Sequence, residues 1–111
     1  MYRVIANGND IKMMEIILKQ IKNLKNAMPD AEIDVVFTRS AVKALLKNSG
    51  YGDIIKELIN SGVKMNACLN TLREMKLSKD DVDTPIGIGF VNAGVEELVR
   101  KQAGGYLYLQ L

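Results

Sequence analysis

Apolar residues follow two alternating patterns along the chain, and these patterns predict its architecture. Short runs rich in β-branched and other apolar residues predict five strands, at residues 2–6, 33–37, 63–66, 86–90 and 106–109. Between these runs, apolar residues recur every three to four positions, which is typical of helices with one buried face. Strands that alternate with helices indicate an α/β fold with three layers, α/β/α, around a mostly parallel five-stranded sheet.

Polar residues at the segment boundaries predict where the helices begin. Asn9 or Asp10 can cap the first long helix, and Asp53 can cap the helix that precedes the third strand. Asn66 is expected to cap the helix after that strand, which would make Cys68 its second residue. Asn92 or Ala93 is expected to open the last helix.

Composition indicates one globular domain that covers residues 1–111. Apolar residues make up 48% of the chain and charged residues 25%, with 15 basic and 13 acidic side chains and a net charge of +2. The lysines follow helical faces without aromatic residues between them, so nucleic-acid binding is not expected. No apolar run has the length of a membrane span or a signal peptide, so no membrane association is expected. With one cysteine and no possible internal disulfide, the expected location is the cytoplasm.

The residues that are absent narrow the chemistry. The chain contains no histidine, so it cannot form a Ser-His-Asp or Cys-His arrangement or a zinc site with histidine ligands. No C-x-x-C pair and no glycine-rich phosphate or dinucleotide fingerprint occurs, and Gly87-Ile88-Gly89 reads as a buried strand. We therefore expect no metal and no cofactor.

The single cysteine, Cys68, lies where a strand leads into a helix. Backbone N–H groups at a helix N-terminus favour the anionic form of a thiol, and thiolates are the nucleophilic form of cysteine. The alternative is that Cys68 is a small buried apolar residue without a chemical role.

Several polar residues follow the predicted strands directly, namely Asn7, Thr38 and Asn92, as Cys68 also does. In open parallel sheets, ligands bind beyond the carboxyl ends of the strands, so we expect a site at this rim. Asn7 and Asn92 also have a structural explanation, since asparagine is favoured in turns and helix caps.

Three segments resemble the DsrE/DsrF-like family, which has the pattern A-C-x-N-T-L-R followed by G-V-x-E-L-V-R-x-Q and a C-terminal aromatic residue. The corresponding segments are residues 67–73, 94–102 and 105–108. The resemblance implies a parallel α/β/α fold, flavodoxin-like in general architecture, that assembles as a homotrimer or homohexamer. It also implies that Cys68 accepts sulfane sulfur as a persulfide, with Asn70, Thr71 and Gly94 as supporting residues of the motifs. The family often has Pro-Ser where this chain has Asn92-Ala93, so the serine hydroxyl that would cap the helix is missing.

Three functions are compatible with these features. The first is a sulfur carrier or sulfurtransferase component with partner proteins that donate and accept sulfur, a role that needs one nucleophilic thiol and no general base. The second is a non-catalytic oligomeric protein that binds a small anionic or nucleotide-like ligand at the rim. The third is a redox sensor that forms a disulfide with another molecule through Cys68. Independently of the resemblance, the apolar C-terminal strand at 106–109 would be protected by homo-oligomerisation if it lies at a sheet edge.

Overall fold

A five-stranded, wholly parallel sheet with the strand order β4-β3-β2-β1-β5 forms the centre of the computed structural model, which describes residues 1–111. Its strands are β1 (Arg3–Gly8), β2 (Glu32–Phe37), β3 (Lys64–Cys68), β4 (Gly89–Val91) and β5 (Leu107–Gln110). The sequence-based expectation of an α/β fold with a five-stranded parallel sheet is therefore confirmed.

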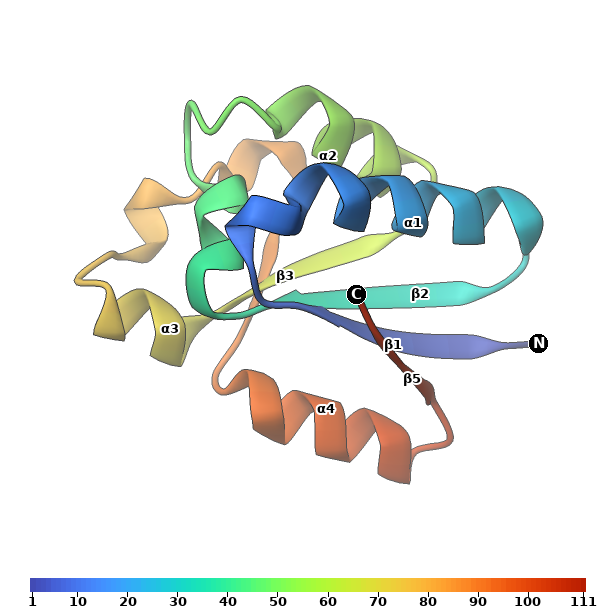
Figure 1. Ribbon diagram of the computed structural model, residues 1–111. Helices are drawn as coiled ribbons and strands as arrows, with labels where there is room; N and C mark the ends of the chain where they lie inside the picture. The colour runs from blue at the N-terminus through green and yellow to red at the C-terminus, as the bar shows by residue number, and fades with distance from the viewer.

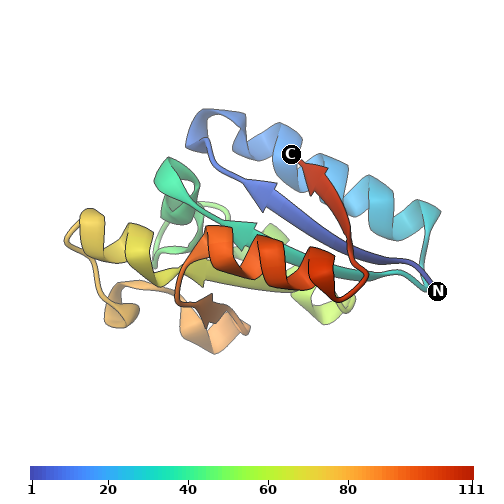
Figure 2. The same ribbon diagram turned by 90° about the horizontal axis from the view of Figure 1, so that it is seen from below.

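Helices cover the two faces of the sheet unequally. They are α1 (Met14–Ala27), α2 (Gly52–Asn60), α3 (Leu69–Glu74) and α4 (Gly94–Ala103), with short 3-10 helices at Ile11–Met13, Arg39–Leu45, Lys79–Asp81 and Thr84–Ile86. Helices α1 and α2 lie together on one face (Figure 1). On the opposite face, α4 is the long helix and runs across the middle of the sheet (Figure 2).

Alternation along the strands gives each face a different character. On β2 and β3 the residues Val35, Phe37, Met65 and Ala67 belong to the apolar core beneath α1 and α2. The residues between them face α4 and include Asp34 and Cys68, both of which contact that helix. The α4 face of the sheet therefore carries most of the polar chemistry of the molecule.

Two expected boundaries outside the site were wrong. Strand β4 begins at Gly89 rather than residue 86, because Thr84–Ile86 is a 3-10 helix containing Pro85 and Gly87 has a φ of +105° that no strand accepts. Helix α2 begins at Gly52 after the cap residue Tyr51, so Asp53 lies in its first turn instead of capping it.

Other boundaries agree with the expectation. The carboxylate of Asp10 accepts a hydrogen bond from the Lys12 N–H and caps the first helical turn. None of the helices is both long enough and apolar enough to span a bilayer.

Candidate functional site

A cleft of about 480 Å³ opens at the carboxyl ends of the central strands, beside the N-terminus of α4. It is lined by residues from β1, β3, α3, α4 and the loop after β2: Asn7, Asn9, Thr38, Arg39, Cys68, Asn70, Thr71, Glu74, Ala93, Gly94, Val95 and Leu98. Of the residues that sequence reasoning selected, only Asn92 is not among them. The rim of a parallel sheet thus brings together side chains that are distant in the sequence.

Cys68 is the last residue of β3 and the N-cap of α3, not the second residue of that helix. The expected cap, Asn66, lies within β3, because the ladder to β2 and β4 continues past it: Asn66 pairs with Val36 and Gly89. The Cys68 side chain makes no capping hydrogen bond to α3, which is only six residues long. The groups that act on its sulfur come from the first turn of α3 and from the N-terminus of α4.

The N-terminus of α4 is in direct contact with the sulfur. The Gly94 N–H donates a hydrogen bond to Cys68 Sγ at 3.2 Å. This contact requires glycine, since a Cβ at position 94 would lie 2.5 Å from Thr38 Cγ2 and 3.3 Å from Val36 Cγ1. The absence of a side chain therefore lets the helix backbone approach the sulfur.

The hydroxyl of Thr71 also acts on the sulfur of Cys68 and lowers the pKa of its thiol. The Arg39 N–H donates to Thr71 Oγ1 at 3.3 Å. Because the Thr71 oxygen accepts this hydrogen bond, its own proton is free to point at the sulfur. Thr71 is itself buried, so this arrangement is shielded from water.

These contacts lower the pKa of the Cys68 thiol below its ordinary value. Burial acts against this, because it raises the pKa, but the Thr71 hydroxyl and the backbone N–H groups of Thr71, Gly94 and Asn70 outweigh it. The Asn70 N–H itself donates to the Asn92 carbonyl at 3.1 Å, so it acts on the sulfur through its field. The cysteine is only 4% exposed, yet it forms part of the cleft wall, so its sulfur lies at the base of an opening rather than in the apolar core.

The remaining predicted residues have structural contacts. Asn7 is buried and donates from Nδ2 to the Val36 carbonyl at 3.0 Å and to Thr38 Oγ1 at 3.1 Å, joining the ends of β1 and β2. Asn70 accepts a hydrogen bond from the Arg73 guanidinium on the exposed side of α3.

Of the two residues expected to open α4, Asn92 and Ala93, the structure selects Ala93. The cap residue is Ala93, which has no side chain able to accept a hydrogen bond, whereas the Asn92 carbonyl accepts from Asn70. Asn92 instead lines a separate polar cavity of about 570 Å³ on the far side of Ala93, together with Asp34 and Lys64.

Sequence reasoning did not select Arg39 or Glu74, which supply the charged side chains of the cleft. Arg39 has a φ of +50°, a conformation that side chains other than glycine, asparagine and aspartate seldom adopt. Its place directly after the predicted rim residue Thr38 is the only signal in the sequence that could have drawn attention to it.

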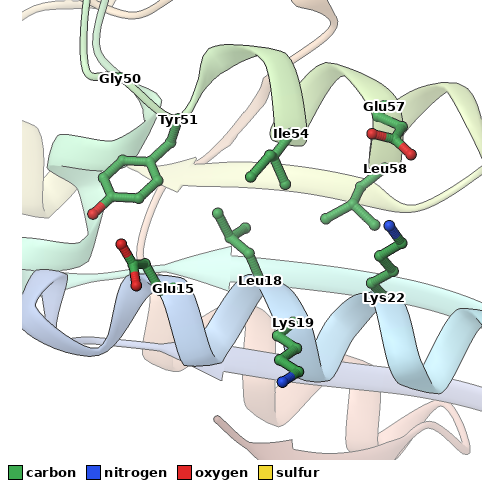
Figure 3. A pocket seen from close by; sticks show the side chains of 9 residues that line it. All are labelled: Glu15, Leu18, Lys19, Lys22, Gly50, Tyr51, Ile54, Glu57 and Leu58. Carbon is green, nitrogen blue, oxygen red and sulfur yellow. The ribbon is translucent and has the colours of Figure 1, made fainter.

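A third cavity, of about 390 Å³, lies between α1 and α2, on the face of the sheet opposite α4. Its apolar wall includes Leu18, Ile54 and Leu58, whose side chains face one another across the gap, with charged residues at the rim (Figure 3). It contains no thiol and none of the predicted site residues. Nowhere in the molecule are three or more His, Cys, Asp or Glu side chains grouped so that they could hold a metal ion.

Comparison with known proteins agrees with this architecture. The model of the DsrE/DsrF-like family matches residues 5–111. A protein of unknown function from Methanobacterium thermoautotrophicum, MTH1491, has a solved structure that is 30% identical, covers 100% of both chains and superposes with a TM-score of 0.92. No curated protein matches the chain.

Two further solved structures are similar in fold. The ychN protein from E. coli is 14% identical over 100% of both chains, with a TM-score of 0.82. The conserved protein of unknown function BT1422 from Bacteroides thetaiotaomicron is 16% identical over 98% of this chain and 94% of its own, with a TM-score of 0.76. Since the family model covers essentially the whole sequence, the chain belongs to the DsrE/DsrF-like family.

Proposed function

We propose that this protein is a sulfur carrier that accepts sulfane sulfur on Cys68 as a persulfide and transfers it to an acceptor. The observation that carries the proposal is the pair of donors on the sulfur: the Gly94 N–H at 3.2 Å and the Thr71 hydroxyl. Together they favour a thiolate at the base of a cleft that a small donor or an extended donor segment can enter. Family membership supports the same role.

The proposed transfer needs no change in the overall oxidation state. The Cys68 thiolate attacks the outer sulfur of a donor persulfide, R–S–SH; a new S–S bond forms, the donor S–S bond breaks and R–S⁻ leaves. Cys68 then carries –S–SH. In the second step a nucleophile of the acceptor attacks the outer sulfur, and the Cys68 thiolate is the leaving group.

A lowered thiol pKa assists both steps. It increases the thiolate fraction that attacks the donor, and it makes Cys68 a better leaving group when the sulfur moves on. No general base is required, which is consistent with a chain that has no histidine. The absence of a second cysteine means that sulfur transfer has to proceed between different molecules or copies.

The test is to incubate the protein with a cysteine desulfurase and cysteine, remove small molecules and measure its intact mass. We expect a gain of one sulfur atom, which is lost on reduction and is absent in Cys68→Ser. No gain in the wild-type protein with several donors, or an equal gain in Cys68→Ser, would contradict the proposal.

A second candidate is a protein that binds a small anion in the same cleft, with Cys68 as a packing residue. Two observations favour it: the cap residue of α4, Ala93, has no side chain that accepts from the first-turn N–H groups, and Arg39 lines the cleft. This candidate predicts a rise in melting temperature with phosphate or a nucleotide that persists in Cys68→Ser. A rise that disappears in Arg39→Gln would locate the anion in the cleft.

We also propose that the protein is a homo-oligomer in the reducing environment of the cytoplasm. The support is an apolar edge: Leu107, Tyr108 and Leu109 of β5 are exposed, and β5 pairs only with β1. A second copy of the chain is the proposed cover for this edge.

A further inference from the structure

Helix α4 has few apolar contacts with the sheet that it crosses. Gly94 is its only fully buried residue, while Val95 and Val99 are 75% and 66% exposed. Apolar burial therefore does little to fix where α4 lies along the sheet, although the Gly94 N–H has to reach the sulfur of Cys68.

An ion pair between a buried aspartate and a partly exposed lysine connects the other end of this helix to the sheet. Asp34 lies within the central strand β2 and is 4% exposed, and its Oδ2 is 3.0 Å from Lys101 Nζ. The Tyr106 ring packs against the same ammonium at 4.7 Å, with Arg3 against that ring at 4.9 Å. The other charged groups that line the cavity beside the pair are Lys64, Glu96, Glu97 and Arg100.

The two ends of α4 are mechanically linked. Lys101 follows Gly94 by two helical turns, so both residues lie on the sheet-facing side of the helix, roughly 10 Å apart. A hydrogen-bonded helix of this length moves as one body. A displacement at Lys101 therefore reaches Gly94.

We propose that Lys101 and Asp34 are positioning residues, whose ion pair sets the place of α4 on the sheet and thereby holds the Gly94 N–H on Cys68 Sγ. An ion pair suits this task because it is directional, whereas apolar side chains at the same place would permit sliding. The importance of the pair for sulfur transfer rests on the function proposed above, but its effect on the thiol can be measured independently.

The test compares the pH dependence of Cys68 alkylation by iodoacetamide, an uncharged reagent, in five proteins: wild type, Lys101→Met, Lys101→Arg, the double variant Asp34→Leu with Lys101→Met, and Lys64→Met. Lys101→Met alone leaves an uncompensated buried carboxylate, which is strongly destabilising. The double variant removes both charges, so the net charge is unchanged and folding is preserved. Lys64→Met removes a lysine from the same cavity that has no ion-pair partner.

We expect the double variant to melt as a folded protein and to alkylate roughly fivefold more slowly at neutral pH, the factor given by loss of about one hydrogen bond. The pH profile of its alkylation rate should shift to higher pH. Lys64→Met should follow the wild-type profile, and Lys101→Arg should retain most of the wild-type rate. A purely structural role would lower the melting temperature without moving the profile.

Wild-type alkylation in a folded double variant would overturn the proposal. Failure of both Lys101→Met and the double variant to fold would also overturn it, because the pair would then be needed for the fold itself. The assay involves no sulfur donor, so a protein that never takes up sulfane sulfur can still show the shift, and a protein without the shift can still be a carrier.

Discussion

At the scale of single residues, the reactivity of Cys68 depends on a chain of hydrogen bonds that begins at Arg39. The Arg39 N–H donates to Thr71 Oγ1, so the hydroxyl proton of Thr71 can point at the sulfur of Cys68. Thr71→Val keeps the shape of the side chain and removes the hydroxyl, so we expect the pKa of Cys68 to rise and alkylation at neutral pH to slow several-fold. Thr71→Ser is the matched control and should stay close to the wild type. Equal rates in the valine and serine variants would contradict the assigned contact.

The lowered pKa of Cys68 also predicts how stability depends on pH. A group whose pKa is lower in the folded than in the unfolded state stabilises the fold above its unfolded pKa, and this contribution disappears as the pH falls through the folded pKa. The difference in free energy of unfolding between wild type and Cys68→Ser should therefore grow in favour of the wild type as the pH rises from the folded towards the unfolded pKa. Urea unfolding at a series of pH values under reducing conditions measures this difference in free energy. A difference that shrinks as the pH rises from the folded to the unfolded pKa would contradict the direction of the pKa shift.

Gly94 is the residue at which backbone proximity matters most. In Gly94→Ala the new Cβ would lie 2.5 Å from Thr38 Cγ2, so α4 has to move away, at a cost of about 1–3 kcal/mol in stability. The Gly94 N–H moves with it, and the alkylation rate of Cys68 should fall as well. Gly104→Ala, at the other end of α4, is the control: a Cβ there comes no closer than 3.5 Å to the Arg100 and Lys101 carbonyls. Calorimetry gives the stability and iodoacetamide the rate; an unaltered rate in Gly94→Ala would mean that the N–H does not act on the thiol.

At the scale of elements, the spacing of apolar residues was sufficient to predict the fold, because strand and helix periodicities differ clearly in this chain. The errors lie where neighbouring elements override local preference. Asn66 is a good helix cap by residue type, but pairing with β2 and β4 keeps it in the strand. The segment from Gly87 to Gly89 reads as part of a strand. The left-handed conformation of Gly87 shortens that strand, so that β4 begins at Gly89.

The candidate cleft could be predicted in part for a similar reason. The sequence could place Asn7, Thr38 and Cys68 together, because the carboxyl ends of parallel strands lie at the same edge of a sheet. The Gly94 contact with the sulfur joins residues 26 positions apart, and no local pattern encodes it. The Asp34–Lys101 pair is equally hidden, since an aspartate in a strand and a lysine near a helix C-terminus are both unremarkable locally.

At the scale of the whole molecule, one edge of the sheet is exposed and apolar. Leu107 is 55% exposed, and Leu109, which is 39% exposed, lies on the same side of β5. We expect the wild type to behave as a trimer or hexamer in light scattering, and Leu107→Glu with Leu109→Glu to yield a smaller species. Ile54→Glu, at an exposed apolar position of α2 beside α1 rather than on the β5 edge, should leave the assembly unchanged. A monomeric wild type would contradict the proposed oligomer.

The solitary thiol also determines how a loaded carrier can be discharged. Many thiol proteins release a bound sulfur or oxidant when a neighbouring cysteine of the same chain closes a disulfide and expels it. Cys68 has no such neighbour, so a persulfide formed on it cannot be expelled as hydrogen sulfide by an internal reaction. The lifetime of the cargo would then be set by when a recipient arrives, which is the property expected of a store that releases only on demand.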